Sequence, residues 1–233
     1  MDLTVRDMTQ LLNVTPETVH RWIRERGLPV RLVNEQYHCN RAELLEWAAA
    51  NKVTVSPKLF RETKGPGQRA ALSLAQALES GGILYDVPGR DLHVALQAMV
   101  ERFPLPSGVN RGSLLRMLLA RERLGSTGIG DGIAIPHVRN PVVLHVDTPL
   151  VTLGFLKQPV AFHAIDGKPV SILFTLITPT IRLHLRLLSQ LAFALQDREV
   201  KDVLRDRRSA NEILAQFARI EKHLASPEPP ART

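Results

Sequence analysis

The chain has 233 residues, of which 44% are hydrophobic, and a net charge of +7 that permits nucleic-acid binding without requiring it. Its one cysteine, Cys39, excludes an intrachain disulfide and fits a reducing compartment. The apolar stretch 169–181 is shorter than the roughly 20 residues of a membrane helix, and no signal-peptide core follows the N-terminus. We therefore expect a cytoplasmic protein of two parts with no membrane partner.

Residues 1–55 predict a small unit in which a tight turn separates two helices. Apolar spacing predicts a first helix from Val5 to Leu12, and Asn13-Val14 predicts a turn. Thr15-Pro16-Glu17 then supplies an N-cap, a proline at the first helical position and an acidic first turn, so a second helix is expected to about Arg24. This arrangement is typical of a helix-turn-helix.

Two short strands and a third helix are predicted next. Leu28 to Val33 and Gln36 to His38 are strand candidates around Asn34-Glu35, which predicts a small wing. Asn40-Arg41-Ala42-Glu43 resembles a capping box and predicts the start of a helix that carries Leu44, Leu45 and Trp47.

The segment Thr18-Val19-His20-Arg21-Trp22-Ile23 and its surroundings resemble the excisionase and MerR-like winged helix-turn-helix family over about residues 1–55. In that family the second helix enters the major groove of DNA. The resemblance implies that DNA is contacted by Thr18, His20, Arg21 and Arg24 of this helix, and by Arg31, Gln36 and His38 of the wing. Two alternatives stay open: Arg21 and Arg24 form an ordinary solvated face, or the unit is reused as a protein-interaction domain.

Residues 56–72 contain helix and strand breakers without periodicity and are interpreted as a linker. The segment 224–233 is proline-rich and is expected to be a disordered tail. Between them, residues 73–223 are expected to form a second domain.

This second domain is predicted to be α/β. Helical spacing covers Leu92 to Phe103, Gly112 to Leu124 and Leu183 to Leu195, and Ser209-Ala210-Asn211-Glu212 is a capping box for a last helix to about Ile220. Leu150 to Phe155 and Val170 to Ile177 are continuous apolar runs, which indicates strands that are buried on both faces.

A glycine-rich stretch from Gly125 to Gly132 leads through Ile133-Ala134-Ile135-Pro136 into His137. Glycines permit positive φ and close backbone approach, so the loop could direct successive NH groups at an anion. The stretch lacks the Gly-Lys-Ser/Thr of a nucleotide-binding P-loop, and an apolar strand rather than a helix follows its glycines, which excludes a dinucleotide fingerprint.

Arg121-Glu122-Arg123-Leu124-Gly125-Ser126-Thr127-Gly128 followed by Gly-Ile-Ala-Ile-Pro-His is similar to the IIA domains of the fructose, mannitol and nitrogen-regulatory branches of the phosphotransferase system. The resemblance extends through Ala161 to Val170, Leu173 to Pro179 and His184 to Ser189. It implies a mixed sheet sandwiched by helices, with His137 at the sheet edge.

The resemblance implies that His137 is phosphorylated by an HPr-type phosphocarrier protein, with Arg121 and His184 as the other active-site residues and Ser126, Thr127, Gly128 and Gly130 as the phosphate-binding loop. Independently, a neutral imidazole offers an unprotonated nitrogen near pH 7 and needs no elaborate base. The alternatives are structural roles: Arg121 is a solvated residue at a helix end, and His184 is a buried core histidine. No metal and no cofactor are expected.

The preferred hypothesis is a regulatory phosphoryl carrier whose fused helix-turn-helix delivers the signal to DNA as a homodimer. Two alternatives remain: a sugar-transport IIA component that hands the phosphoryl group to a separate IIB domain, and a regulator that binds target proteins but no DNA. Phosphohistidine chemistry makes the chain a phosphoryl carrier rather than an enzyme acting on a small molecule.

Overall fold

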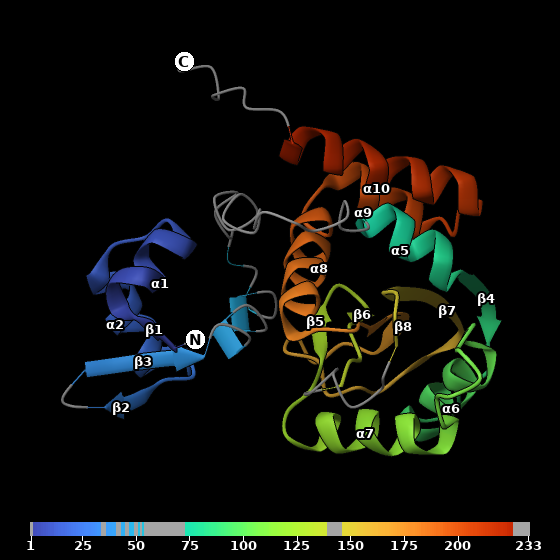
Figure 1. The fold of residues 1–233 in the computed structure, drawn as a ribbon, viewed down its shortest axis with the longest axis horizontal. Coiled ribbons are helices and arrows are strands. Elements are labelled where there is room, and N and C mark those ends of the chain that lie inside the picture. Colours follow the sequence, from blue (N-terminus) through green and yellow to red (C-terminus); the bar gives the residue numbers. More distant parts are fainter. Residues whose placement is uncertain are drawn as a thin grey trace.

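A computed structural model describes residues 2–33, 36–40, 43–44, 47–48, 51, 53, 73–138 and 146–225 of the chain. It contains two units that lie beside each other, one at the N-terminus and one built from residue 73 onward (Figure 1). The predicted linker 56–72 and the residues after Ala225 lie outside the described residues. No helix in these ranges is long and apolar enough to cross a membrane.

The N-terminal unit is the predicted helix-turn-helix with a three-stranded antiparallel sheet of order β1-β3-β2. Its elements are β1 (Asp2–Thr4), α1 (Val5–Leu12), α2 (Pro16–Glu25), β2 (Arg31–Val33) and β3 (Gln36–Asn40). Both helix starts are capped, by Thr4 for α1 and by Thr15 for α2, and Asn13 adopts a left-handed φ of 51° that ends α1. The predicted turn and cap are therefore confirmed.

The sheet of this unit differs from the sequence prediction in two places: β2 starts later than expected, and an additional strand, β1, is present. The strand that was expected from Leu28 begins only at Arg31, because the Leu28 NH donates to the Trp22 carbonyl at 3.2 Å and its side chain is buried in the core. Strand β1 was not predicted; it forms by pairing Leu3 with Cys39, a contact between distant parts of the sequence. Of the predicted third helix, the described residues Glu43, Leu44, Trp47 and Ala48 are helical, and Asn40, its predicted N-cap, is the last residue of β3. The rest of the predicted helix lies outside the described residues.

The core of this unit packs the two tryptophans together. Trp22 from α2 lies with its ring centroid 5.2 Å from that of Trp47, and both are at least nine-tenths buried. The Trp47 indole NH donates to the Arg26 carbonyl at 2.9 Å, which satisfies its polar end. Trp22 is thus a core residue and does not present a stacking surface.

The second unit is a five-stranded mixed sheet of order β4-β7-β8-β6-β5 with helices on both faces (Figure 1). Its elements in chain order are α5 (Leu74–Gly81), β4 (Ile83–Val87), α6 (Leu92–Arg102), α7 (Arg111–Arg123), β5 (Gly128–Gly130), β6 (Ile133–Ala134), β7 (Leu150–Val160), β8 (Val170–Ile177), α8 (Ile181–Ala194), α9 (Arg198–Arg205) and α10 (Ala210–Ala225). β4 is parallel to β7 and β6 to β8, whereas β7 and β8 are antiparallel.

Two apolar clusters lie on opposite faces of the sheet. One joins the sheet to α5, α8, α9 and α10, and the other joins it to α6 and α7. The central strands β7 and β8 contribute to both clusters, which is why their sequences are continuously apolar. The predicted sandwich is therefore confirmed.

Several element bounds differ from the sequence predictions. The capping box of Ser209 and Glu212 is present, with the Ser209 hydroxyl donating to Glu212 at 2.6 Å, but α10 continues past Ile220 to Ala225. Ile220 is buried against the sheet, and the partly buried Leu224 extends the same contact by one turn. The short elements α5, β4, β5 and α9 were not predicted, because each has only 3 to 8 residues and too few positions for a periodic pattern.

Gly81 provides a direct test of how α5 packs on the sheet. A Cβ at this position would lie 2.3 Å from the Val151 carbonyl oxygen, and backbone atoms cannot rotate away. We expect Gly81→Ala to destabilise the second unit by about 1–3 kcal/mol, which exceeds the roughly 1 kcal/mol that alanine adds to helix stability. Urea unfolding followed by far-UV circular dichroism measures the change.

Gly108→Ala is the matched control, because a Cβ added at Gly108 would meet no other atom within 4 Å. It should change stability by less than about 0.5 kcal/mol. Both tryptophans lie in the first unit, so tryptophan fluorescence monitors that unit in the same samples. Equal stability of the two variants would contradict the close packing of α5 on β7.

Candidate functional site

The glycine-rich stretch forms a tight β-hairpin, β5 and β6, at one side of the sheet. Gly130 pairs with Ile133, and the two residues between them, Asp131 and Gly132, have φ of 54° and 73°. Positive φ at both positions is the geometry of a two-residue hairpin turn, for which Asp-Gly is a favoured sequence. That dipeptide between apolar residues was the signal that could have predicted the hairpin.

His137 lies just beyond β6 and next to the central strand β8. It forms an isolated parallel bridge with Leu176, and the Leu176 NH donates to the Pro136 carbonyl at 3.3 Å. The expectation that His137 sits at the sheet edge needs correction: the outer strand on this side is β5, and His137 follows the strand inside it. Pro136 has no NH to donate, so its carbonyl, which accepts from Leu176, is the group that holds this backbone against β8.

The tautomer of His137 is set by its own backbone. Its Nδ1 lies 2.7 Å from the carbonyl oxygen of Ile135. Because a carbonyl oxygen only accepts, this hydrogen bond requires the proton on Nδ1. In the neutral ring the lone pair then resides on Nε2, which is the nitrogen able to act as a nucleophile.

His184 lies beside His137, as the predicted pair requires. It comes from the first turn of α8, which Thr180 caps, and the centroids of the two imidazole rings are 5.1 Å apart at 48°. Both side chains are almost fully buried, with 2% of His137 and 3% of His184 exposed. Two residues 47 positions apart in sequence thus form one site.

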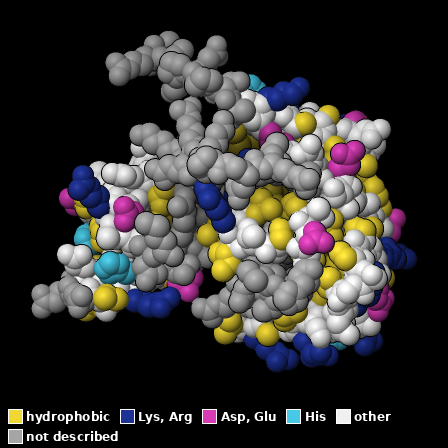
Figure 2. Space-filling model, viewed as in Figure 1, with side chains coloured by type: hydrophobic (Ala, Val, Ile, Leu, Met, Phe, Trp, Pro, Cys, Tyr) yellow, Lys and Arg dark blue, Asp and Glu magenta, His cyan; other side chains and the backbone are white. Residues whose placement is uncertain are grey.

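Arg121 lies in the last turn of α7, where the glycine-rich stretch begins. Its Nη1 donates to the Gly125 carbonyl oxygen at 2.8 Å, so the guanidinium lies against the loop rather than pointing away as a solvated helix end. Cationic side chains gather along α7 on the face drawn in Figure 2, and those of its last turn are Arg121 and Arg123.

The loop amides differ from the expected anion-binding arrangement. The Thr127 NH donates to Glu122 at 2.9 Å and the Gly128 NH to the Ser126 hydroxyl at 2.9 Å. Gly130 belongs to strand β5. These amides therefore hold the loop in shape, and Gly128 is required because a Cβ there would lie 2.6 Å from that of Ala164.

Glu122 is a site residue that the sequence reasoning missed. Its carboxylate accepts from both the NH and the hydroxyl of Thr127, at 2.9 and 2.6 Å, and so ties the end of α7 to the start of the hairpin. In the sequence it stands within a charged run of Arg121-Glu122-Arg123, and no local pattern separates it from a solvated acid.

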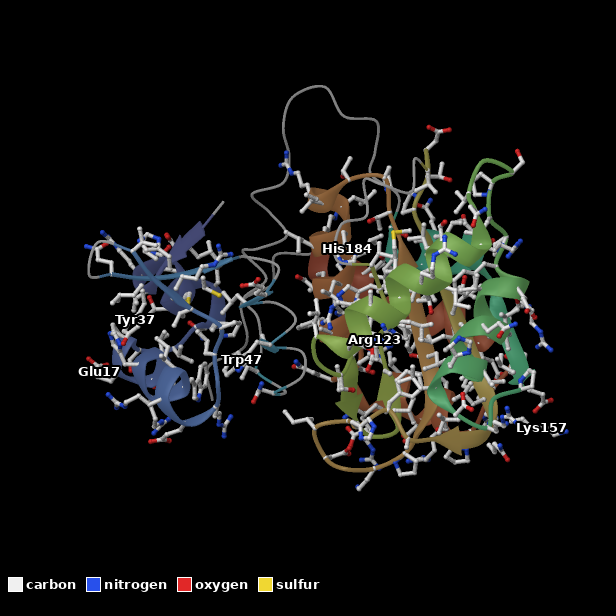
Figure 3. All side chains as sticks on the ribbon, turned by 90° about the horizontal axis from the view of Figure 1, so that it is seen from below. Glu17, Tyr37, Trp47, Arg123, Lys157 and His184 are labelled. Carbon is white, nitrogen blue, oxygen red and sulfur yellow. The ribbon has the colours of Figure 1, made fainter. Side chains whose placement is uncertain are left out.

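The predicted DNA-contacting residues share one unit but differ in exposure. Arg21 and Arg24 on α2 and Arg31 on β2 are exposed, whereas Thr18 and His20 are partly buried. Thr18 helps to cap α2, and the His20 ring contacts that of Tyr37 edge-on at 5.8 Å. Figure 3 places Glu17, at the start of α2, and Tyr37 on the side of this unit away from α8, so this end of the helix is open.

Within the described ranges, no group of three or more His, Cys, Asp or Glu side chains has a metal-binding arrangement. Two imidazoles therefore lie side by side, and an imidazole with a free lone pair is a nucleophile that can accept an anionic group.

Comparison with known proteins agrees with this architecture. Residues 78–220 match the family described as phosphoenolpyruvate-dependent sugar phosphotransferase system, EIIA 2, and residues 3–52 match a helix-turn-helix domain. The chain therefore belongs to the EIIA type 2 family of the phosphotransferase system, with a helix-turn-helix domain fused in front.

Nitrogen regulatory proteins are among its relatives. The one from Pseudomonas aeruginosa is 38% identical over 138 residues, which cover 58% of this chain and 87% of that protein. The one from Escherichia coli strain K12 is 38% identical over 128 residues, covering 53% and 74% of the two chains. The crystal structure of nitrogen regulatory protein IIA-Ntr from Neisseria meningitidis aligns with a TM-score of 0.55 at 31% identity, over 62% of this chain and 98% of that one.

Proposed function

We propose that this protein is a nitrogen-regulatory phosphoryl carrier in which His137 accepts a phosphoryl group from an HPr-type phosphocarrier and the helix-turn-helix domain delivers the signal to DNA. The observation that supports it most is the hydrogen bond from His137 Nδ1 to the Ile135 carbonyl at 2.7 Å. In the neutral ring it places the lone pair on Nε2, beside a second imidazole, within a family of phosphotransferase-system proteins.

The transfer itself needs positioning and charge stabilisation more than a base. His137 Nε2 attacks the phosphorus atom of the carrier's phosphohistidine, the new N–P bond forms, and the carrier's ring nitrogen leaves with the bonding pair. Charge in this loose transition state lies on the three nonbridging oxygens. His184 is 5.1 Å away, centroid to centroid, and is our candidate hydrogen-bond donor to them. Arg121, at the base of the same loop, is our candidate cation.

The surface around the loop suits a protein partner. Leu124 at the end of α7, Ile165 and Ile181 at the start of α8 are 68%, 56% and 50% exposed. The first two flank the glycine-rich hairpin, since Leu124 precedes it and the Ile165 NH bonds to the Gly128 carbonyl. Exposed large apolar side chains around a polar site are typical of a docking surface. We assign this surface to the phosphocarrier.

Helix α8 offers a route from the site to the DNA-binding unit. It carries His184, and the next residue, Leu185, packs against the apolar core of the helix-turn-helix unit. Figure 3 shows Trp47 on the side of that unit nearer to α8, and Figure 1 shows the unit alongside this helix. Because the His137 ring is only 2% exposed, the carrier needs a rearrangement around it before transfer. We infer that this rearrangement disturbs the Leu185 contact.

His137 is expected to be the sole stable phosphorylation site. Incubation with phosphoenolpyruvate, enzyme I and an HPr-type carrier should label the wild type with acid-labile phosphate and leave His137→Ala unlabelled. Phosphorus–nitrogen coupling in NMR spectra should assign the phosphoryl group to Nε2, because Nδ1 holds the proton. His93→Ala, at an exposed histidine on α6, is the control and should be labelled normally. Label that persists in His137→Ala would refute the assignment.

Arg121→Ala is expected to slow phosphorylation by about 100-fold or more, as loss of one aimed donor commonly does. Arg121→Lys should restore only part of the rate, because lysine keeps the charge but not the planar fork. The matched control is Arg123→Ala, an exposed arginine in the same helical turn. Rapid-quench phosphorylation assays measure all three rates. If Arg121→Ala and Arg123→Ala behaved alike, Arg121 would be a solvated helix-end residue.

Phosphorylation is expected to weaken DNA binding. The phosphoryl group adds about two negative charges to a chain whose exposed Arg21 and Arg24 are our candidate phosphate contacts, so it repels a nearby duplex or competes for these arginines. A titration on a duplex selected with the full chain should show tighter, steeply salt-dependent binding by the unphosphorylated form, as a homodimer.

The DNA titration includes three variants. Arg21→Ala should reduce affinity and lower the salt slope by about one, whereas Arg90→Ala, an exposed arginine of the second unit, should change neither. Leu185→Ala should reduce the difference in DNA affinity between the phosphorylated and unphosphorylated proteins, because it removes the contact between α8 and the helix-turn-helix unit. Equal affinity of the two wild-type forms would show that the units are uncoupled, and tighter binding after phosphorylation would reverse the proposed sign.

A further inference from the structure

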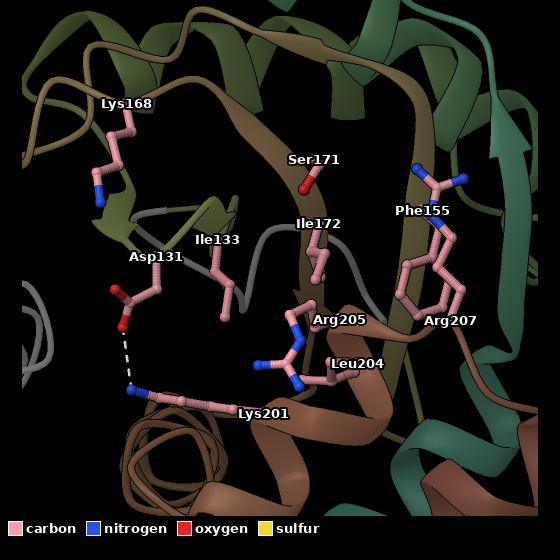
Figure 4. Close-up of a pocket in the computed structure, with 10 residues that line it drawn as sticks. All are labelled: Asp131, Ile133, Phe155, Lys168, Ser171, Ile172, Lys201, Leu204, Arg205 and Arg207. Atoms are coloured by element: carbon pink, nitrogen blue, oxygen red, sulfur yellow. Dashed lines mark hydrogen bonds and ion pairs between the residues drawn. The ribbon is translucent and has the colours of Figure 1, made fainter.

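A cavity lies in the phosphotransferase unit, on the face of the sheet that carries α9 (Figure 4). Its volume is about 530 Å³, within the range of small-molecule sites in proteins. It adjoins the start of β8, where Ile172 pairs with Ile133, whereas His137 pairs with Leu176. Four residues of strand separate the two places by about 13 Å. The cavity is therefore distinct from the His137 site.

The rim of this cavity is cationic and its floor is apolar. Lys168, Lys201, Arg205 and Arg207 line it, against a single carboxylate from Asp131. They come from three segments: the loop before β8, helix α9, and the turn after α9. The floor is made by side chains of the apolar cluster beneath α9, among them Phe155 and Leu204. A charged rim above an apolar floor suits an organic anion.

Hydrogen bonds hold this rim in position. The Asp166 carboxylate accepts from the backbone NH of Asp131 at 3.0 Å and of Lys168 at 3.1 Å, so it ties together the two loops on one side. The NH of Lys168 is the largest cause that lowers the pKa of Asp166. On the other side, Arg207 adopts φ of 49°, and its Nη2 donates to the Leu156 carbonyl at 2.8 Å. Left-handed φ is uncommon for arginine, and the hydrogen bond to Leu156 holds its guanidinium in place.

One ion pair spans the cavity mouth. Lys201 Nζ on α9 lies 3.0 Å from Asp131 Oδ2 in the hairpin turn, and both side chains are nearly two-fifths exposed. A pair this exposed is weak, so an incoming anion can compete with Asp131 for the ammonium group. Asp131 thus opposes anion binding while Lys201 favours it.

We propose that this cavity binds a small organic phosphate. Lys201 and Arg205 lie one helical turn apart on α9 and offer an ammonium group and a guanidinium fork to one phosphate group. Arg205 also pairs with Asp202, with 2.8 Å between Nη2 and Oδ1, but that pair is exposed and therefore weak. The carbon skeleton of the ligand lies on the apolar floor. Because none of these residues belongs to the phosphoryl-transfer site, the binding does not depend on His137.

Isothermal titration of the full chain with fructose 1,6-bisphosphate and with ADP tests the proposal, with fructose and adenosine as uncharged controls. At least one phosphate should bind and neither control should. Lys201→Gln should weaken binding about tenfold, as loss of one charge-assisted hydrogen bond does. Asp131→Asn should tighten it severalfold, since it removes the carboxylate that pairs with Lys201. Asparagine tolerates the left-handed φ of this position, so the turn is preserved.

Two further variants separate this cavity from other sources of anion binding. Arg198→Gln removes a cation that is 95% exposed on the same helix but does not line the cavity, and it should leave the affinity unchanged. His137→Ala should bind the phosphate as the wild type does. If the phosphate were held at the phosphoryl-transfer site instead, this variant would lose the binding. The proposal is overturned if neither phosphate binds at millimolar concentration, if Asp131→Asn fails to tighten binding, or if His137→Ala abolishes it.

Discussion

The hydrogen bond between His137 Nδ1 and the Ile135 carbonyl is the interaction on which the site depends. It decides which nitrogen carries the lone pair, and it does so with an acceptor from the same strand, only two residues away. The acceptor is held in turn, because the Ile135 NH bonds to the Thr127 carbonyl at 3.0 Å and Leu176 bonds to Pro136. The orientation of the imidazole therefore follows in part from backbone hydrogen bonds around β6 and β8.

The rest of the unit serves to bring His184 to this ring and Arg121 to the glycine-rich loop. The parallel pairing of β6 with β8 places His137 at the end of β8 from which the chain turns into α8, and Thr180 caps this helix so that His184 falls in its first turn. Glu122 joins the end of α7 to the glycine-rich hairpin, which brings Arg121 to the loop. Buried clusters on both faces of the sheet hold these elements at fixed distances.

Elements that depend on local signals were predicted from the sequence, and elements that depend on contacts between distant residues were not. Capping boxes, proline at the first turn of α2 and the apolar runs of β7 and β8 are local signals, and each predicted its element. Strand β1 and the late start of β2 were missed or misplaced, because Leu3 is a strand residue only through Cys39 and Leu28 bonds back to Trp22. The loop glycines were assigned to anion binding, whereas Gly128 allows close contact with Ala164.

The sequence by itself determined that a glycine-rich stretch leads into a proline-fixed histidine, that a capped helix-turn-helix precedes it, and that two central strands are buried on both faces. These features depend on φ preferences, on capping and on the periodicity of apolar residues, all of which act over a few positions. Only the tertiary structure decided that His184 lies against His137, that Glu122 holds the loop, and that four cations from three segments line one cavity. The reason is physical: these groups meet through packing between segments far apart in the chain, and no local preference encodes such a meeting.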